Sequence, residues 1–387
     1  MKKNKYIRHS VPYLVIAALL LLMPALNSCE EVQGEMEEFM TKEKTLLVYM
    51  VANNDLSGNA VNNFADMQKG YIPAEEGNLV VYYHIPNQNP LLLNIIQGSD
   101  GKAQIDTAYK FPARNSATKA SLESALKVTA TLFPAKETGL MLWSHATGWL
   151  PEGYYANPAV RSFGNDSGVE MDLKELKEAL PYKLSFIIFD ACLMGGIEVA
   201  YELKDSTDHI IFSPAEILAA GFPYSKIMGH IFESPTDLQA VAEEYYNFYQ
   251  NQSSNNYATI SLIKTSELES VAEISKAIFA GNREKIQSVD VNTLQRYFRN
   301  NKHWFYDFRD FIGRIAEPGQ LVEFDAALDK AVLYKAATDY FMDLPIRKYS
   351  GMSIYVPVPE NEALYTYYRT LEWNKACGMI EEQQVLE

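Results

Sequence analysis

The stretch SFIIFDACLMGG, residues 185–196, runs from a block of β-branched and aromatic residues into Asp190, Ala191 and Cys192, and closes on two glycines. Apolar runs of this length, without alternating polar residues, are typical of strands buried on both faces in a parallel sheet. The glycines that follow predict a turn at the carboxyl end of this strand. The chain has only three cysteines, and one of them, Cys192, is expected where this central strand ends.

The rest of the chain alternates strands with helices. Four more apolar runs occupy residues 45–52, 78–86, 140–145 and 209–214, and segments with helical periodicity occupy 59–67, 119–133, 172–180 and 196–203. This alternation predicts an α/β fold with a mostly parallel sheet covered by helices. Beyond residue 230 helical patterns dominate, interrupted by strand candidates at 257–263 and 351–358. We therefore expect a core over residues 44–265 and a mostly helical C-terminal region over 266–387 that includes a returning strand.

The carboxyl ends of the strands are where open α/β sheets bind their ligands. His145 ends one predicted strand and Cys192 ends another, 47 positions later. That separation fits one loop and one right-handed crossover, so the two strands can be neighbours about 4.8 Å apart. His84, at the end of the run at 78–86, is a rival base, although we interpret it as a structural histidine.

This pairing of residue types suits nucleophilic catalysis. A thiol becomes a good nucleophile near neutral pH when a histidine takes its proton or stabilises its thiolate. The glycines at 195–196 and the helical pattern after them place Cys192 just before a helix N-terminus, where backbone N–H groups can hold an oxyanion. The alternative is an inert core cysteine, which is a common fate of buried thiols.

The residues around the two candidates resemble a known family. His145 followed by Gly148 and Trp149, and then DACLM at residues 190–194, is similar to the clostripain family of cysteine peptidases, over roughly residues 44–357. The resemblance implies a caspase-like three-layer sandwich and a lysine- or arginine-directed endopeptidase. It also implies that Cys192 is the nucleophile, acting through a thioester, and that His145 is its proton partner.

Substrate recognition is implied by the same resemblance. Asp190 matches the family's acidic residue in the pocket for a basic side chain, and a structural carboxylate at the strand end is its alternative role. Members usually carry His-Gly, whereas Ala146 follows the histidine here; the backbone N–H groups of Ala146 and Cys192 are the expected oxyanion donors. In SPAEILAAGFPY, residues 213–224, only Glu216 is acidic. Glu216 is therefore the second candidate for substrate binding, and the apolar residues around it favour a less basic substrate.

Two further expectations concern the loop at 150–168 and cofactors. Arg161 is the only basic residue of that loop, and some family members cut themselves after the histidine, so Arg161 is a candidate for autocleavage. The acids Asp166, Glu170 and Asp172 lack the spacing of an EF-hand. We predict no metal and no other cofactor.

The N-terminus reads as a targeting segment over residues 1–28. Basic residues precede an apolar run at 11–25 that is too short for a typical membrane-spanning helix. LNSC, residues 26–29, resembles the lipobox of bacterial lipoproteins, which implies a lipid on Cys29 and a tether over 29–43. An ordinary cleaved signal with a chance cysteine is the alternative. The resemblance implies export and a lipid anchor in the bacterial envelope, at the outer membrane and facing the surface.

The net charge of the chain excludes some classes of binding partner. The net charge is −15, and it becomes about −19 once the four basic residues of the leader are removed. Such an acidic chain is not expected to bind nucleic acid, and it would contact a membrane only through its lipid. We expect a peptide or protein substrate, and the sequence does not predict the oligomeric state. A catalytically silent lipoprotein that binds a peptide, glycan or protein partner is the alternative function.

Overall fold

Parallel pairing of the predicted strands builds the centre of the fold. The computed structural model describes residues 41–151, 162–299, 302, 304–357 and 362–381. Within these residues, nine strands form one sheet in the order β12-β10-β9-β8-β5-β1-β2-β3-β4. They are β1 (Lys42–Val51), β2 (Gly77–His84), β3 (Leu91–Gln97), β4 (Ala103–Lys110), β5 (Ala135–Trp143), β8 (Leu184–Asp190), β9 (Thr207–Phe212), β10 (Thr259–Lys264) and β12 (Val332–Ala337).

The middle of the sheet is parallel and its edges are antiparallel. β2, β1, β5, β8 and β9 pair parallel with one another in that order. β3 and β4 extend one edge, and β10 and β12 the other, through antiparallel pairs. The predicted α/β fold with a mostly parallel sheet is confirmed.

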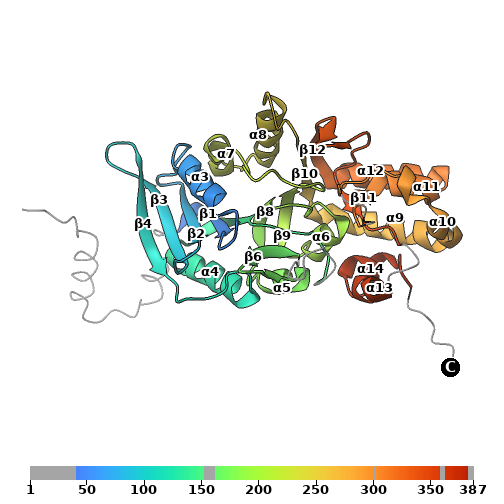
Figure 1. The fold of residues 1–387 in the computed structure, drawn as a ribbon, viewed down its shortest axis with the longest axis horizontal. Coiled ribbons are helices and arrows are strands. Elements are labelled where there is room, and N and C mark those ends of the chain that lie inside the picture. The colour runs from blue at the N-terminus through green and yellow to red at the C-terminus, as the bar shows by residue number, and fades with distance from the viewer. Residues whose placement is uncertain (1–40, 152–161, 300–301, 303, 358–361, 382–387) are drawn as a thin grey trace, which may run out of the picture. The chain divides into compact units, whose positions relative to one another are not determined.

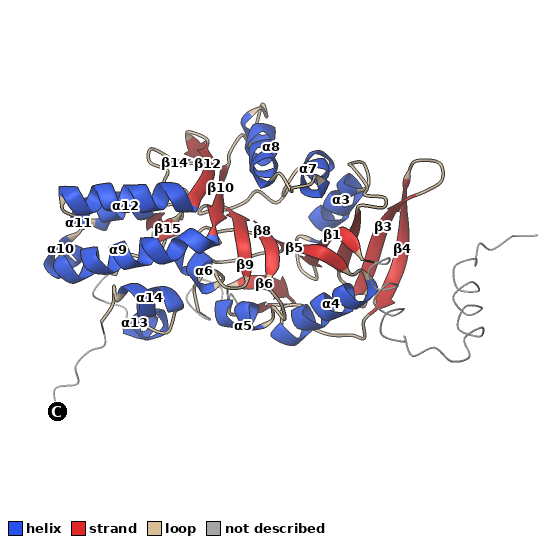
Figure 2. Ribbon diagram, turned by 180° about the vertical axis from the view of Figure 1, so that it is seen from behind, coloured by secondary structure: helices blue, strands red, loops and turns tan. Residues whose placement is uncertain are grey.

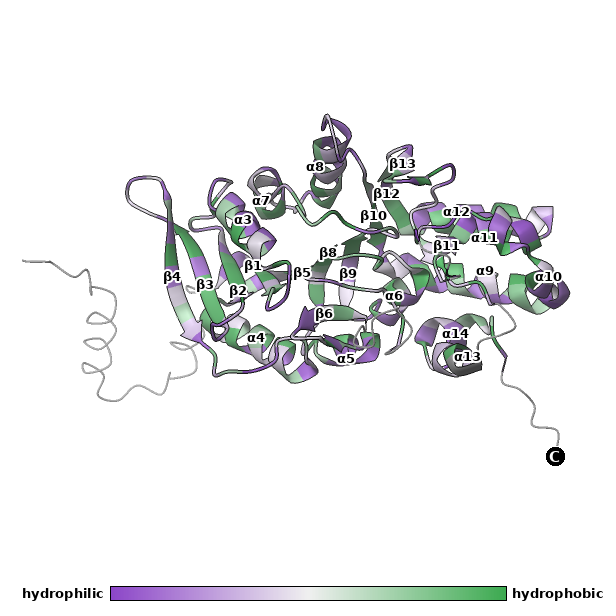
Figure 3. Ribbon diagram, viewed as in Figure 1, coloured by the Kyte–Doolittle hydropathy of each residue, from purple (hydrophilic) through white to green (hydrophobic). Residues whose placement is uncertain are grey.

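Helices cover both faces of the sheet (Figures 1 and 2). One face carries α3 (Ser57–Met67), α7 (Tyr224–Phe232) and α8 (Leu238–Gln250), and the other carries α4 (Lys119–Leu132), α5 (Leu173–Glu178) and α6 (Ile197–Glu202). β1 shows why two faces need cover: Leu47 and Tyr49 belong to one apolar core and Val48 and Met50 to the other, and all four are fully buried. Alternate side chains of the strand thus pack into two apolar cores, one on each face of the sheet. The sheet and the helices on its two faces form a three-layer sandwich. In Figure 3 the inner strands β8 and β10 are mostly green, whereas α11 alternates purple and green.

The C-terminal region is mostly helical, as predicted. Its helices are η1 (Thr265–Glu267), α9 (Leu268–Gly281), α10 (Arg283–Ser288), η2 (Val291–Thr293), α11 (Phe308–Ile315), α12 (Pro318–Ala331), α13 (Glu362–Tyr368) and α14 (Glu372–Cys377). Short pairs complete the fold: β6 (Phe163–Asp166) with β7 (Val169–Met171), β11 (Tyr306–Asp307) with β15 (Ser353–Ile354), and β13 (Tyr340–Phe341) with β14 (Leu344–Pro345).

Three details differ from the sequence-based expectation. The helical pattern after residue 318 stops at Ala331, and the following residues form β12, which joins the main sheet beside β10. The strand expected at 351–358 is reduced to the two residues of β15, which pair with β11 outside the main sheet. The hairpin β3–β4 was not expected, because β4 is exposed on both faces and carries no apolar alternation.

Several predictions concern residues outside the described ranges. The signal peptide at 1–28, Cys29 and nearly all of the tether at 29–43 lie before residue 41, and Arg161 lies in the gap at 152–161. Among the helices that the structure describes, none combines the length and apolar character needed to cross a bilayer.

Candidate active site

The register of β5 and β8 brings His145 and Cys192 to matching positions. The two strands pair in parallel, with Trp143 opposite Asp190 at their carboxyl ends. His145 lies two residues beyond Trp143, and Cys192 lies two residues beyond Asp190. Both candidates therefore leave neighbouring strands at the same level of the sheet, which is the arrangement that the sequence predicted.

The site also lies where the strand order reverses. From β1 the chain moves outward to β2 on one side, and it later returns to β5 and β8 on the other side of β1. Such a switch point opens a crevice at the carboxyl edge of the sheet. The loops after β1, β5 and β8 all leave the sheet there.

The loops that carry the two candidates pack directly against each other. Gly148 adopts a left-handed φ of 70°, and a Cβ on it would come within 2.7 Å of the Leu193 carbonyl oxygen. Leu193 itself adopts a φ of 63°, a conformation that costs a non-glycine residue energy and is often found at functional sites. Its N–H donates to the carbonyl of Ala215 at 2.9 Å. The backbone around Cys192 is thus held from two sides.

The His145 imidazole is paired with a carboxylate from a third loop. Its Nε2 lies 2.8 Å from Oδ1 of Asp55, which follows β1. The hydrogen bond from His145 lowers the pKa of the Asp55 carboxyl, more strongly than partial burial raises it. No role was predicted for Asp55 from the sequence.

The Cys192 thiol is held by the main chain of Ile217. The N–H of Ile217 donates to Sγ at 3.4 Å, and the thiol lies 3.5 Å from the carbonyl oxygen of the same residue. Burial raises the pKa of the thiol to about 12; the Ile217 contact lowers it, and the nearby carboxylates of Glu216 and Asp190 raise it. In the conformation described here the thiol is protonated near neutral pH, and no hydrogen bond joins it to His145.

The two predicted oxyanion donors, the N–H groups of Ala146 and Cys192, are not used within the described part of the fold. Among the hydrogen bonds of the described residues, none uses the N–H of Ala146 or of Cys192. Ala146 pairs with Phe163 through the bonds of its neighbours, His145 and Thr147. The expectation that Cys192 sits just before a helix needs correction, because α6 begins five residues later at Ile197 and the thiol's backbone partner comes from Ile217 instead.

Asp190 is buried and bonded within the protein. Its Oδ2 accepts hydrogen bonds from the Tyr224 hydroxyl at 2.8 Å and from the Phe222 N–H at 3.2 Å. Gly221, with a φ of 69°, passes so close that a Cβ there would come within 2.6 Å of the carboxylate. Burial raises the pKa of Asp190 to about 6, against the lowering effect of these hydrogen bonds. Asp190 therefore supports the segment that contains Glu216 and Ile217.

Glu216 forms an ion pair with an arginine of the same chain, Arg299. Both carboxylate oxygens face the guanidinium of Arg299, Oε2 toward Nε and Oε1 at 3.1 Å from Nη2. The Glu216 side chain is 19% exposed, so it lies at the edge of the site. This two-pronged geometry is the one that binds an arginine most strongly, and it was not predictable because Arg299 is far away in the sequence.

The sequence profile of the clostripain family, Peptidase_C11, matches residues 48–387. The chain belongs to the clostripain family. Clostripain of Hathewaya histolytica is 23% identical over 245 residues, which cover 53% of this chain and 45% of that protein. The chain thus matches less than half of the length of this relative.

Solved structures of clostripain-family proteins resemble the chain over most of its length. An inactive zymogen C11 protease from Parabacteroides distasonis is 34% identical with a TM-score of 0.79, and the match covers 87% of this chain and 98% of that one. A secreted C11 cysteine protease from Bacteroides thetaiotaomicron, solved with an irreversible peptide inhibitor, is 27% identical with a TM-score of 0.77 and the same coverage. These likenesses confirm the predicted caspase-like architecture.

His84, the rival base, belongs to a buried network on β2. Its Nδ1 lies 2.7 Å from the Ser116 hydroxyl and 3.1 Å from the Asp166 carboxylate. The Tyr82 hydroxyl also contacts Ser116, and Asp166 accepts the Ser116 N–H at 2.6 Å. These contacts of Nδ1 and the burial of the side chain agree with the interpretation of His84 as a structural histidine.

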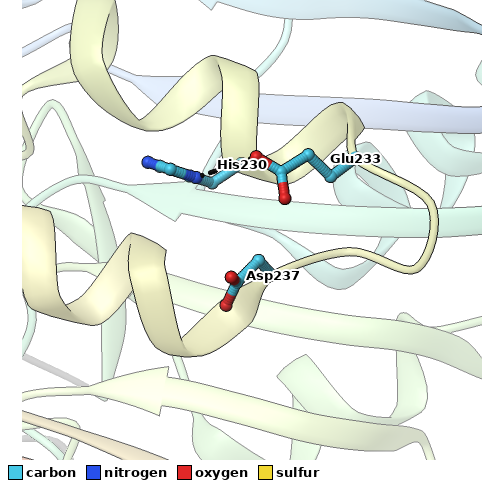
Figure 4. A group of neighbouring side chains, drawn as sticks. All are labelled: His230, Glu233 and Asp237. Carbon is cyan, nitrogen blue, oxygen red and sulfur yellow. Dashed lines mark hydrogen bonds and ion pairs between the residues drawn. The ribbon is translucent and has the colours of Figure 1, made fainter.

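The acids near the loop at 150–168 have structural roles too. Asp166 belongs to the His84 network, Asp172 caps α5, and Glu170 accepts a hydrogen bond from Asn165. Among the described residues, one group could offer three ligand atoms within 4.8 Å: His230 in α7, Glu233 directly after it, and Asp237 directly before α8 (Figure 4). Glu233 is bonded to His230 and Asp237 caps α8. Nothing about this group points to a bound ion.

Proposed function

We propose that the chain is a cysteine endopeptidase in which Cys192 is the nucleophile and His145 its proton partner. The observation that carries the proposal is the register of β5 and β8. Trp143 pairs with Asp190, and His145 and Cys192 each follow two residues later in the chain. Family membership supports it, because similar structures are cysteine proteases. The packing of Gly148 against Leu193 supports it further, since it fixes the two loops relative to each other.

The reaction follows from these groups. The Cys192 thiol passes its proton to His145, and the sulfur attacks the carbonyl carbon of the scissile bond. The N–H groups of Ala146 and Cys192 stabilise the resulting oxyanion. His145 protonates the leaving amine, which breaks the C–N bond and leaves a thioester on Cys192. His145 then takes a proton from water, the hydroxide attacks the thioester, and the sulfur leaves and recovers the proton.

The thiol must first leave the main chain of Ile217. While the thiol is held there, its pKa of about 12 keeps it protonated, and His145 is bonded to Asp55 instead. A movement of the segment at 213–224 would free Sγ and let it approach the imidazole. We infer that the described conformation is a resting state from which the dyad assembles.

We propose that cleavage occurs after Arg or Lys, with Glu216 as the carboxylate that receives the basic side chain. Glu216 already binds a guanidinium, that of Arg299, and it directly precedes the residue that contacts the thiol. A substrate arginine would replace Arg299 in this pair. Asp190 adds negative charge from within, but its Oδ2 is used by Tyr224 and Phe222.

The test is hydrolysis of peptides that differ only in the residue before the cleaved bond. The proposal predicts cleavage after Arg and Lys, no cleavage by Cys192→Ala, and a selective loss toward basic residues in Glu216→Gln. Asp325→Asn, which breaks a similar pair with Arg309 elsewhere, is the matched control and should keep the preference. Cleavage after other residue types that is insensitive to Glu216→Gln would refute this specificity.

The alternative is a catalytically silent protein that binds a peptide, glycan or protein partner. The contact of the thiol with Ile217 and its raised pKa favour this alternative. A peptidase and a silent binding protein differ in how the Cys192 thiol reacts when a peptide binds. An active enzyme should form a covalent adduct with an electrophilic peptide at Cys192, whereas a silent one should bind the peptide reversibly.

We also propose that the protein is exported and anchored at the bacterial outer membrane, facing the surface, by a lipid on Cys29. The residues LNSC at 26–29, after a short apolar run, support this. Mass spectrometry of the mature protein should find a lipidated N-terminal cysteine. Cys29→Ala should release the protein from the membrane fraction, and an unmodified N-terminus in the wild type would refute the anchor.

A further inference from the structure

A basic cavity lies in the C-terminal region, lined by residues of two segments, 291–296 and 344–348, with contributions from Lys302, Tyr306 and Asp310. Its volume is about 650 Å³, within the range of about 300–1,000 Å³ typical of small-molecule sites. None of the residues assigned to catalysis or substrate binding lines it. It is therefore a separate feature of the fold.

The charge of this cavity opposes that of the chain. Its lining holds four cationic side chains and a single carboxylate: Arg296, Lys302, Arg347, Lys348 and Asp310. The whole chain has 34 basic and 49 acidic residues, so the sign of the charge in this cavity is opposite to that of the chain as a whole. Like charges gathered at one site repel each other, and an anion that binds there relieves the repulsion.

The one carboxylate is already neutralised. Oδ1 of Asp310 pairs with Nζ of Lys348 at 2.6 Å and with Nε of Arg314 at 3.4 Å, and Oδ2 accepts the Gln295 N–H at 2.9 Å. Among the described residues, no carboxylate pairs with Lys302 or Arg347. Both side chains are exposed. Two positive charges are therefore available to a ligand.

Gln295 holds the two walls of the cavity together. Its Oε1 accepts the Arg347 N–H at 2.8 Å, and its Nε2 donates to the Pro345 carbonyl at 3.0 Å. Leu294 and Leu344, both largely buried, add apolar groups to the lining. The backbone that carries Arg347 is thus fixed before a ligand arrives, which reduces the entropy lost on binding.

We propose that this cavity binds a small multivalent oxyanion, a molecule that carries two or more phosphate or carboxylate groups. Guanidinium groups bind such oxygens through paired hydrogen bonds, and lysine ammonium groups add point charges. The apolar groups of Leu294 and Leu344 in the lining suit the uncharged body of such a ligand. The site is independent of the proposed peptidase activity.

The proposal is tested by calorimetric titration of the purified protein with inorganic pyrophosphate and, separately, with citrate, at low ionic strength. The variant is Lys302→Gln with Arg347→Gln. The control is Lys102→Gln with Lys110→Gln, which removes the same charge from exposed positions on and beside β4, away from the cavity lining. Thermal unfolding verifies that both variants are folded.

We expect at least one of the two anions to bind the wild type and the control with similar Kd, and the cavity variant to bind it at least about tenfold more weakly, a loss of about 1.4 kcal/mol. Binding of pyrophosphate alone would identify a phosphate-bearing ligand, and binding of citrate alone a polycarboxylate. The proposal is overturned if neither anion binds, or if the control variant loses as much affinity as the cavity variant.

Discussion

Nε2 of His145, beyond the end of β5, lies 2.8 Å from Oδ1 of Asp55, beyond the end of β1. The two residues are 90 positions apart in the sequence and meet because β1 and β5 are adjacent parallel strands. The contact fixes one ring nitrogen of the imidazole and leaves Nδ1 for other partners. Asp55 thus acts as a positioning residue for His145 in the proposed mechanism.

Asp55→Asn should lower kcat for peptide hydrolysis by at most about fivefold, because the Asp55 carboxylate is largely exposed and an exposed ion pair is worth up to about 1 kcal/mol. KM should stay the same, since Asp55 is not assigned to substrate binding. Steady-state kinetics on one arginine peptide measures both constants. Asp100→Asn, on the β3–β4 turn, is the control and should match the wild type. A change confined to KM would contradict the positioning role.

Glu216→Gln should speed the alkylation of Cys192 by iodoacetamide. The substitution removes a negative charge that raises the thiol pKa, and it loosens the Arg299 pair that anchors the residue before Ile217. Because the thiolate is the reactive form, each unit by which the pKa falls gives about a tenfold faster reaction. Peptide mapping by mass spectrometry follows Cys192, with buried Cys377 as an internal reference. Equal acceleration in Asp325→Asn would show that the effect is unspecific.

Tyr224→Phe should lower the free energy of unfolding by about 1–2 kcal/mol at pH 8, because it removes a hydrogen bond to a buried carboxylate. The bond favours the ionised form of Asp190, whose pKa is raised by burial to about 6. The loss should therefore shrink at pH 5, where the carboxyl is mostly protonated. Urea denaturation at both pH values measures it. Tyr182→Phe, which loses only a bond to a neutral carbonyl, should show no such pH dependence.

The stability of the fold should fall as pH rises from about 4.5 to 7, partly because of Glu198. This side chain is fully buried, and burial raises its pKa to about 7 from 4.5, against hydrogen bonds from Tyr355 and Tyr368. The folded state holds a proton that the unfolded state releases over this range, so a rise in pH favours unfolding. The contribution reaches about 3 kcal/mol.

Glu198→Gln tests this contribution directly, because the amide keeps an oxygen acceptor but cannot ionise. The difference in unfolding free energy between variant and wild type should shift in favour of the variant as pH rises from 5 to 8. Glu123→Gln, on the exposed face of α4, is the control and should show a constant difference. A pH-independent difference for Glu198→Gln would contradict the raised pKa.

The sequence was sufficient to place the catalytic candidates, because local patterns mark the ends of buried strands. The apolar runs before His145 and Cys192 became β5 and β8, and each strand ends two residues before its candidate. The glycines at 195–196 were visible as turn residues, and Gly148 only as part of the family resemblance. The close approach of Gly148 to Leu193, and of Gly195 to Ser213 and Pro214 just after β9, is visible only in the structure.

Contacts between distant segments account for what the sequence did not reveal. β12 follows α12 without a glycine or proline, and only its pairing with β10 makes it a strand. The thiol partner is a main-chain group of Ile217, which no side-chain pattern can indicate. Tyr224 and Arg299 reach their carboxylates from elements 34 and 83 positions away. Such partners depend on tertiary packing, so residue type alone could not identify them.

In the proposed mechanism Cys192 attacks the substrate with the help of His145. The decisive experiment is to incubate the protein with an electrophilic peptide that ends in arginine and to map the adduct by mass spectrometry. We expect one adduct, on Cys192, that appears in parallel with the loss of peptide hydrolysis and forms far more slowly in His145→Ala. An adduct on another residue, or hydrolysis that continues after Cys192 is fully labelled, would contradict this mechanism.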